Sequence, residues 1–307
     1  MLDVCVVMLD NGYCSTALAP VEIFHSAGTL WKKLHGQEPE PRFRVTTASV
    51  DGKPVKAPYG GMTIAPEVSI SQVKSVDVVL ISSGGLELDD SLQRYAALLP
   101  WLKKQYAAGA YIAGICAGAA FPAEAGLLDG RRATTHWALA EGYAQRYPKV
   151  QWSPTLFVTE EARVLCSGGV SAAADISLYL VEKLCGHEVA VQTAKALLLS
   201  MPRTHQSGYA VLPLSPPHGD ERIRVVEARL QERYPEAHAN EGLAALAGMS
   251  ECNFLRRFKA ATGRVPAGYL QAVRIEAAKV MLEREAASIQ SVASAVGYED
   301  VALFRTL

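Results

Sequence analysis

A cysteine stands where an apolar stretch predicted as a strand runs directly into a predicted helix. Residues 110–115 (AYIAGI) form the apolar stretch, and Cys116 is followed by two small residues. Small neighbours permit the strained turn of a nucleophile elbow, and the start of a helix lowers the pKa of a thiol placed there. Gly84 and Gly85 follow another predicted strand and are placed to offer backbone N–H donors opposite the thiol. The pattern predicts a reactive thiol or a ligand-facing one.

A histidine, His136, follows Cys116 by 20 residues in the sequence Thr-Thr-His-Trp. Cysteine catalysis needs a positioned base and a group that orients that base. Ala117 stands directly after the cysteine, so the sequence has no adjacent Cys-His pair, and it assigns no carboxylate to His136. We therefore favour a ligand-binding pocket over catalysis. Two simpler interpretations stay open: Cys116 is a small apolar residue at a tight turn, and His136 is a half-buried side chain with satisfied hydrogen bonds.

Short apolar or β-branched stretches predict the strands that position these residues, at 4–9, 43–49, 76–82, 110–115 and 164–167. Helical patterns lie between and after them, at 20–34, 91–108, 117–125, 137–147, 171–184 and 187–200. Strands that are apolar on both faces and alternate with helices predict an α/β fold. We expect a flavodoxin-like, mostly parallel sheet with helices on both faces.

Ligands of such sheets bind in the crevice beyond the carboxyl ends of the strands. That rule places a pocket at the loop 10–15, after the first predicted strand, together with the cysteine turn. The residues predicted to line it are Asp10, Tyr13, Ser15, Gly84, Gly85, Cys116 and His136. The polar groups of the loop favour a small polar metabolite, such as an amine or an amino-acid derivative. No metal or other cofactor is expected, because the six cysteines are scattered and lack histidines or carboxylates at ligand spacing.

The chain has 307 residues, half of them hydrophobic, and a net charge of −1. This length suits two domains. Residues 201–220 are rich in Pro, Gly and Ser and have no period, which is typical of a linker. We therefore predict an α/β domain at 1–200, a linker at 201–220 and an all-α domain at 221–307. The first residues lack the basic region of a signal peptide and are too short for a membrane span, so a cytoplasmic location is expected.

The all-α region contains two patterns typical of helix-turn-helix units. In the first, LAALA at 243–247 leads to Gly248, which permits a left-handed turn, and to Ser250, which can cap the next helix. That helix, 251–261, is expected to bury Phe254 and Phe258. Its outward residues are Glu251, Cys252, Leu255, Arg256 and Lys259. Arg256, Arg257, Lys259 and Arg264 form a basic patch that suits phosphates, whereas the bulk charge gives no indication of nucleic acid.

The second pattern begins at 289–295 and continues through Gly297 to a helix that starts near Asp300. A long helix at 267–285 joins the two units. A rigid joining helix would set both recognition helices on one face, where they reach successive major grooves about 34 Å apart. An α bundle of this composition serves protein interaction or structure more often than DNA binding, so the residues alone leave both alternatives open.

Three runs of this region resemble the AraC/XylS family: GMSECNFLRRFKAATGRVPAGYL at 248–270, RIEAAKVML at 274–282 and SVASAVGYEDVALFR at 291–305. The resemblance implies double-stranded promoter DNA as a partner, with RNA polymerase as a possible second contact. It assigns base reading to Cys252, Leu255 and Arg256 in the first recognition helix and to Ala302, Arg305 and Thr306 in the second. Arg256 suits a guanine, Leu255 a thymine methyl group, and Lys259 a phosphate. Since that family continues beyond the position of Leu307, the second unit is expected to be incomplete.

Four motifs of the first 200 residues resemble the PfpI branch of the glutamine-amidotransferase-like superfamily: APVEIF at 19–24, the cysteine turn, EAGLLDGRRATTHW at 124–137 and SGGVSAAADISLYLV at 167–181. With the C-terminal region they are similar to GlxA-like regulators, which fuse this fold to an AraC-type domain. In enzymes of the superfamily a glutamate hydrogen-bonds the cysteine, and the resemblance implies Glu22 for that role. Cys116, Glu22 and His136 then form a candidate thiol site.

The resemblance implies a non-enzymatic transcriptional regulator whose α/β domain dimerises and binds a small-molecule effector, without a membrane partner. Two alternatives use Cys116 chemically. One is a cysteine-dependent enzyme, either a hydrolase or a glyoxalase-like or deglycase-like enzyme, tethered to DNA. The other is a thiol redox sensor.

Overall fold

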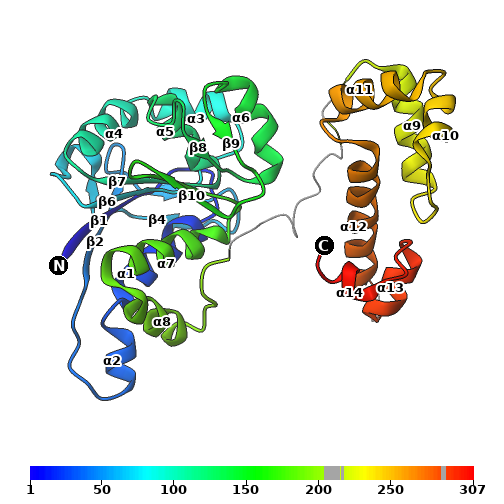
Figure 1. Ribbon diagram of the computed structural model, residues 1–307. Helices are drawn as coiled ribbons and strands as arrows, with labels where there is room; N and C mark the ends of the chain where they lie inside the picture. Colours follow the sequence, from blue (N-terminus) through cyan, green and yellow to red (C-terminus); the bar gives the residue numbers. More distant parts are fainter. Residues whose placement is uncertain (204–214, 216–217, 285–287) are drawn as a thin grey trace. The chain divides into compact units, whose positions relative to one another are not determined.

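The computed structural model describes residues 1–203, 215, 218–284 and 288–307. The chain forms two compact units, Met1–Ala210 and Val211–Leu307, which Figure 1 shows as an α/β unit and a helical unit. Most of the segment predicted as a linker, 204–214 and 216–217, lies outside the described residues. Its first residues belong to the α/β unit, because the Arg203 side chain pairs with Asp175.

The α/β unit is built on a seven-stranded sheet in the order β10-β11-β7-β6-β1-β2-β5. β10 pairs antiparallel with β11, and the other neighbours pair parallel. The strands are β1 (Leu2–Val7), β2 (Phe43–Ser49), β5 (Val68–Ser69), β6 (Val78–Ile81), β7 (Tyr111–Ile115), β10 (Val158–Glu161) and β11 (Val164–Ser167). The central strands are buried on both faces, which is what their unbroken apolar runs require. The predicted fold class is confirmed.

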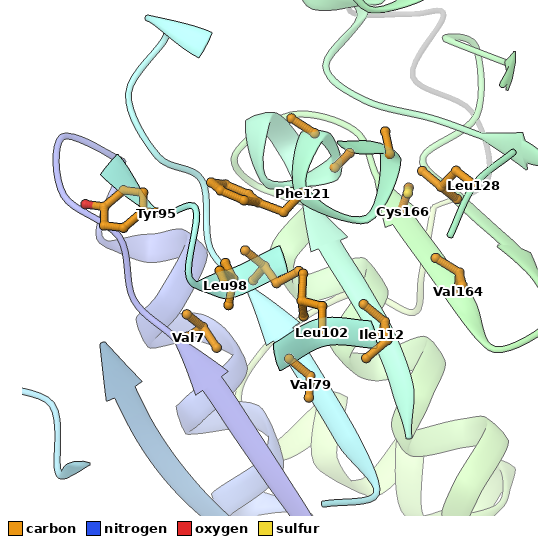
Figure 2. Packing of buried hydrophobic residues seen from close by; sticks show 14 of the residues in the cluster. Val7, Val79, Tyr95, Leu98, Leu102, Ile112, Phe121, Leu128, Val164 and Cys166 are labelled. Atoms are coloured by element: carbon orange, nitrogen blue, oxygen red, sulfur yellow. The ribbon is translucent and has the colours of Figure 1, made fainter. Parts of the chain in front are cut away.

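Two apolar layers cover the sheet. On one face pack α3 (Leu88–Arg94), α4 (Leu98–Ala107) and α5 (Ala120–Glu124); on the other pack α1 (Ser15–Ser26), α7 (Ala172–Cys185) and α8 (His187–Ala196). Figure 2 shows the first layer, where Leu98, Leu102 and Phe121 lie on the strand residues Val79 and Ile112. Each such side chain contributes about 1.5–3 kcal/mol when it leaves water. These layers hold the carboxyl ends of the strands in place.

The predicted helix at 20–34 is wrong in both its start and its length. Proline is favoured at a helix start, but here Pro20 lies inside α1, which begins five residues earlier at Ser15. The chain then breaks at Gly28, whose φ of +75° is left-handed, and α2 (Leu30–Leu34) follows. A Cβ on Gly28 would lie 2.1 Å from the Glu40 carbonyl oxygen, so only glycine fits this break.

Other predicted helices are divided. The stretch 91–108 forms α3 and α4, the stretch 117–125 forms η2 (Cys116–Ala119) and α5, and the stretch 137–147 forms η3 (Trp137–Leu139) and α6 (Ala140–Arg146). Four short strands were not predicted: β3 (Val55–Lys56) pairs with β4 (Thr63–Ile64), and β8 (Arg132–Ala133) pairs with β9 (Gln151–Trp152), both outside the main sheet. A further 3-10 turn, η1 (Ile70–Gln72), follows β5.

The helical unit contains α9 (Glu221–Glu232), α10 (Asn240–Leu246), α11 (Glu251–Thr262), α12 (Pro266–Arg284), α13 (Ile289–Ala295) and α14 (Val301–Phe304). Its first core lies among α9, α10, α11 and the start of α12, and its second lies among α12, α13 and α14. In Figure 1, α12 runs from the first group of helices to the second. The predicted pair of helix-turn-helix units joined by a long helix is therefore present.

Candidate functional site

The turn after β7 holds Cys116 in a strained backbone conformation. Its φ is +55°, a left-handed value that is uncommon for a residue with a side chain. A Cβ on Gly118 would lie 2.6 Å from the Ile81 carbonyl oxygen, so the turn packs directly on β6. The Thr135 hydroxyl donates to the Cys116 carbonyl oxygen at 2.9 Å, and the Tyr143 hydroxyl donates to the Ala117 carbonyl oxygen at 2.9 Å. These contacts fix the turn from both sides.

The Cys116 thiol is buried, with 4% of the residue exposed. Burial raises the pKa of this thiol, although hydrogen bonds from the Ser83 side chain and the Ala117 backbone oppose that shift. The expected lowering of the thiol pKa is therefore wrong. A 3-10 turn of four residues brings too small a dipole to offset the loss of water around a thiolate. The thiol is protonated at neutral pH and is a weak nucleophile there.

Glu22, the carboxylate predicted to contact Cys116, lies on the exposed face of α1. The buried face of this helix includes Thr16, Pro20 and Ile23. Thr16 is the α1 residue that is tied to the elbow's surroundings: its hydroxyl accepts a hydrogen bond from the Ser83 backbone N–H at 3.0 Å and donates to the Tyr13 carbonyl oxygen at 2.7 Å. The sequence missed Thr16 because the predicted helix began only at Pro20.

His136 is held as a neutral ring. Its Nδ1 accepts a hydrogen bond from the Ala138 backbone N–H at 3.1 Å, which caps η3 and leaves the ring hydrogen on Nε2. Burial lowers the pKa of His136. The ring lies against Gly169, where a Cβ would come within 3.0 Å of the imidazole Cδ2. In this tautomer Nε2 carries the ring hydrogen and cannot accept a proton, so His136 is not set up as a base.

A cavity of about 370 Å³ lies beside the loop that follows β1. Of the predicted pocket residues it takes in Asp10, Tyr13 and Gly85. Ser15 is the exposed first residue of α1, and Gly84, Cys116 and His136 stay outside the described lining of this cavity. The structure thus separates the predicted site into an open cavity and the buried turn Cys116–Ala119, which we call the thiol turn.

The cavity also has lining residues that sequence reasoning missed: Asn11, Pro58, Tyr59, Leu86, Glu87, Asp90, Ser91, Arg94 and Tyr95. Several of them follow a spacing of three and four residues from 87 to 95. Such spacing places side chains on one helix face. It was the one feature of the sequence that could have indicated these lining residues. Tyr59 comes from the segment between β3 and β4, which no periodicity marked.

Charge and aromatic rings dominate the cavity. Its lining includes three carboxylates, Asp10, Glu87 and Asp90, and one guanidinium, that of Arg94, which lies 3.5 Å from Asp10 Oδ2. The Tyr95 hydroxyl donates to Asp10 Oδ2 at 3.1 Å, and the Lys56 backbone N–H donates to Asp10 Oδ1 at 2.7 Å. Burial raises the pKa of Tyr95, so this phenol stays protonated as a donor. The cavity is therefore electronegative, with the Asp10 carboxylate fixed in place.

Two further tyrosines border the same cavity. The rings of Tyr13 and Tyr59 lie 5.7 Å apart between centroids with an interplanar angle of 45°. The Tyr59 hydroxyl accepts a hydrogen bond from the Cys14 backbone N–H at 3.1 Å, which orients its ring at the mouth. Aromatic faces beside carboxylates attract ammonium groups. The arrangement suits a small ligand that carries a positive charge.

The first candidate DNA-binding helix is α11. Gly248 adopts a φ of +64° in the turn before it, and Phe254 and Phe258 are fully buried beneath it. Glu251, Cys252, Arg256 and Lys259 are exposed, whereas Leu255 is half-buried. Arg256 donates to the Asn253 side-chain oxygen at 3.0 Å. Arg257 instead pairs with Asp220 at 2.9 Å, which anchors α11 to the start of α9.

The second candidate helix is short. Asp300 caps α14 by accepting hydrogen bonds from the Ala302 and Leu303 backbone N–H groups at 2.8 and 3.0 Å. Ala302 is exposed on α14, and Arg305 and Thr306 are exposed just after it ends. The turn before it contains Gly297, with a φ of +86°. All three predicted base-reading residues therefore lie on the surface.

Within the described ranges, no helix has the length and apolar character to span a bilayer. A search of the same residues for three or more histidine, cysteine or carboxylate side chains grouped for metal binding finds none. The geometry leaves two regions with potential function, the electronegative cavity and the exposed faces of the two helix-turn-helix units.

Residues 19–183 match the DJ-1/PfpI family, and residues 243–307 match a helix-turn-helix domain. The chain is 28% identical over 267 residues to the HTH-type transcriptional regulator CdhR of Pseudomonas aeruginosa, an alignment that covers 85% of this chain and 77% of that protein. It is 24% identical over 269 residues to the HTH-type transcriptional regulator GlxA of Rhizobium meliloti, covering 86% and 81%. A crystal structure of an AraC family transcriptional regulator from Pseudomonas putida matches with a TM-score of 0.54 and 23% identity, covering 64% of this chain and all of that one. This last likeness shows the fold.

The fold, the paired helix-turn-helix units and these relatives define the class: a DNA-binding transcriptional regulator with an α/β unit attached to its helical unit. The chain belongs to the DJ-1/PfpI family, and its C-terminal domain is a helix-turn-helix domain of the AraC type. The resemblance stated from the sequence is confirmed.

Proposed function

We propose that this regulator is controlled by a small amine-bearing metabolite that binds in the cavity lined by Asp10, Tyr59 and Arg94. The observation that carries the proposal is the composition of the cavity, three carboxylates and three tyrosines with one arginine. An ammonium group gains from nearby carboxylates and from aromatic faces together, by about 0.5–2 kcal/mol for each aromatic contact. Arg94 is 55% exposed and pairs with Asp10 only at 3.5 Å, so its outer nitrogens add a position for a ligand carboxylate, and a zwitterion with separated charges suits the cavity best.

Cysteine chemistry is not part of this proposal. The thiol of Cys116 is buried and its pKa is raised, and His136 uses Nδ1 as an acceptor for a backbone N–H. Acyl transfer needs a thiolate and a base within reach. We infer that Cys116 holds the strained turn and that the protein is not an enzyme. Substituting Cys116 with alanine should then leave the transcriptional response to the effector unchanged.

Three probes separate the charges of the ligand: 4-aminobutyrate carries both, 1-aminobutane carries the ammonium only, and butyrate carries the carboxylate only. We expect thermal stabilisation of the full chain in that order, because a ligand bound only by the folded state raises the melting temperature. Asp90→Asn and Tyr59→Leu should reduce the shift. Asp51→Asn, an exposed carboxylate on another loop, is the matched control. Stabilisation by butyrate alone would contradict the proposal.

The helical unit is proposed to read promoter DNA with the exposed residues of α11 and of the α14 region, named above. Arg256 is proposed for a guanine, Leu255 for a thymine methyl group and Lys259 for a phosphate. We further propose that the regulator acts as a homodimer in the cytoplasm and contacts RNA polymerase at the promoter. Light scattering of the purified chain tests the dimer, and a monomer at micromolar concentration would contradict it.

A further inference from the structure

One arginine of the joining helix contacts both helix-turn-helix units. Arg274 lies on α12, and its guanidinium donates to four backbone carbonyl oxygens. Three of them belong to the segment after α9: those of Tyr234 at 2.7 Å, Pro235 at 3.3 Å and Glu236 at 2.9 Å. The fourth is that of Gly297, in the turn before α14, at 3.1 Å. The planar fork of arginine can serve these oxygens at once, which a lysine ammonium cannot do.

The same segment touches the second unit in two other ways. The Tyr234 side chain packs against both apolar cores of the helical unit, one in each helix-turn-helix. Gly297 lies so close to the segment that a Cβ there would be 2.4 Å from the Pro235 carbonyl oxygen. The guanidinium also lies over the Tyr298 ring, 5.3 Å from its centroid. Segment 234–236 is thus a spacer between the two units, and Arg274 fastens it to both.

The packing around this junction leaves open space on one side. Arg274 and Tyr298 line a cavity of about 390 Å³ that also borders the start of α12 and the helix α10. Side chains beside such a space can shift with little loss of contact, unlike those in a filled core. The hydrogen bonds of the guanidinium therefore supplement the packing of Tyr234 and Gly297 in setting the angle between the two units.

We propose that Arg274 is a positioning residue for DNA reading, and that it fixes the spacing and rotation of α11 relative to α14. It needs no DNA contact of its own for this role. One base pair added between two half-sites rotates the second by about 35° around the duplex axis. We call the hydrogen bonds of Arg274 to both units the brace. A rigid brace makes the protein select one spacing between the half-sites, whereas a loosened brace lets it bind several. The proposal rests on the proposed reading of DNA by both units.

Binding sites selected from a randomised duplex library by the full chain supply the DNA probe. For the wild-type protein, we expect one base pair inserted between the half-sites to weaken binding about tenfold or more. Arg274→Lys should bind the selected site about tenfold more weakly and discriminate less than about threefold between the two spacings. Arg229→Lys, an exposed arginine on α9, is the control and should keep the wild-type discrimination. Unchanged discrimination in Arg274→Lys would overturn the proposal.

A distance measurement tests the brace without DNA. Cys252 is exposed on α11, and Ala302→Cys places a second thiol on α14. Cys14 and Cys185 are changed to serine so that nitroxide labels attach at positions 252 and 302. Double electron–electron resonance then measures the distance between α11 and α14. We expect one narrow distribution for the otherwise wild-type chain and for Arg229→Lys, and a broad one for Arg274→Lys and for Gly297→Ala. A narrow, unshifted distribution in Arg274→Lys refutes the brace, whereas failure of the library to yield a site refutes only the DNA-binding assignment.

Discussion

The thiol turn and the α11 helix begin alike and differ in what they do with their side chains. The thiol turn starts at a left-handed residue, Cys116, with a φ of +55°. The turn before α11 contains another, Gly248, with a φ of +64°. Glycine adopts this conformation without cost, whereas a cysteine in it costs about 1–3 kcal/mol that the surrounding structure must offset. The thiol turn is therefore strained and buried, and α11 is relaxed with an exposed outer face.

This contrast separates the effects that substitutions should have. The thiol turn packs on β6 and is tied down by Thr135 and Tyr143, so changes there should appear in stability. The outer residues of α11 have solvent on one side, so changes there should appear in DNA affinity and leave folding intact. The buried face of α11 is the exception within its own helix.

The largest effect is expected on that buried face. Phe258 is fully buried, and its ring lies 5.5 Å from the rings of both Phe254 and Tyr269. Phe258→Ala should destabilise the helical unit by about 3–5 kcal/mol through lost burial and the cavity left behind. All four tryptophans belong to the α/β unit. Urea unfolding followed by circular dichroism should therefore shift while tryptophan fluorescence does not.

The matched control is Val225→Ala on α9, where the side chain is 52% exposed and little apolar contact is lost. It should leave both transitions in place. An equal shift of the tryptophan transition in Phe258→Ala would contradict the independence of the two units.

The second largest effect is expected at Gly118 in the thiol turn. A Cβ on Gly118 would lie 2.6 Å from the Ile81 carbonyl oxygen and 2.7 Å from that of Ser82. These are backbone atoms at the end of β6 and just after it, which cannot rotate away, so Gly118→Ala should cost the upper end of about 1–3 kcal/mol. Gly142→Ala on α6 meets no atom within 4 Å and should stabilise by about 0.5–1 kcal/mol. Equal tryptophan unfolding curves for the two variants would show that the turn is not tightly packed.

The third prediction concerns the exposed face of α11. Arg256→Ala should weaken binding to the selected duplex by about 1–3 kcal/mol and relax the preference at one base pair, with stability unchanged. Arg257→Ala is the informative neighbour, because Arg257 is paired with Asp220 and should act on the stability of the helical unit. Gel shifts with single-base variants of the duplex measure the effect of Arg256→Ala, and urea unfolding followed by circular dichroism measures that of Arg257→Ala. If Arg256→Ala keeps its base preference, α11 does not read DNA through this residue.

Local spacing explains which parts of this molecule were predictable. The outer face of α11 comes from one helix, so its period sufficed to place Arg256 outward and Phe254 inward. Ser250 stands at the predicted start of this helix, but its side chain makes no capping hydrogen bond. The strands β2 and β11 have the bounds predicted for them, 43–49 and 164–167. Such features depend on residues a few positions apart, and elementary periodicity captures them.

The cavity was predictable only in part, because its residues come from three segments far apart in the sequence. The rule for parallel sheets located the Asp10 loop, but Tyr59 and Arg94 arrive through loop and helix geometry that no single segment encodes. Glu22 was misplaced for a different reason. The family resemblance selects its position in the chain, whereas the packing of α1, which buries Thr16, Pro20 and Ile23, leaves Glu22 on the exposed face.

The smallest expected effect concerns His136, whose chain neighbour Thr135 donates to the Cys116 carbonyl oxygen of the thiol turn. Burial lowers the pKa of this ring below its ordinary value of 6.5, so the unfolded chain binds its proton first as the pH falls. The neutral ring therefore contributes stability above about pH 6.5, and that contribution is lost as the pH drops through the lowered pKa. His136→Asn keeps an acceptor for the Ala138 N–H, since asparagine caps helices well, but removes the titration. The melting temperature of this variant, compared with wild type between pH 7.5 and pH 5, should fall less on acidification. Parallel curves would mean that His136 titrates as it does in the unfolded chain, and the thiol turn would then be more open to water than the buried Cys116 implies.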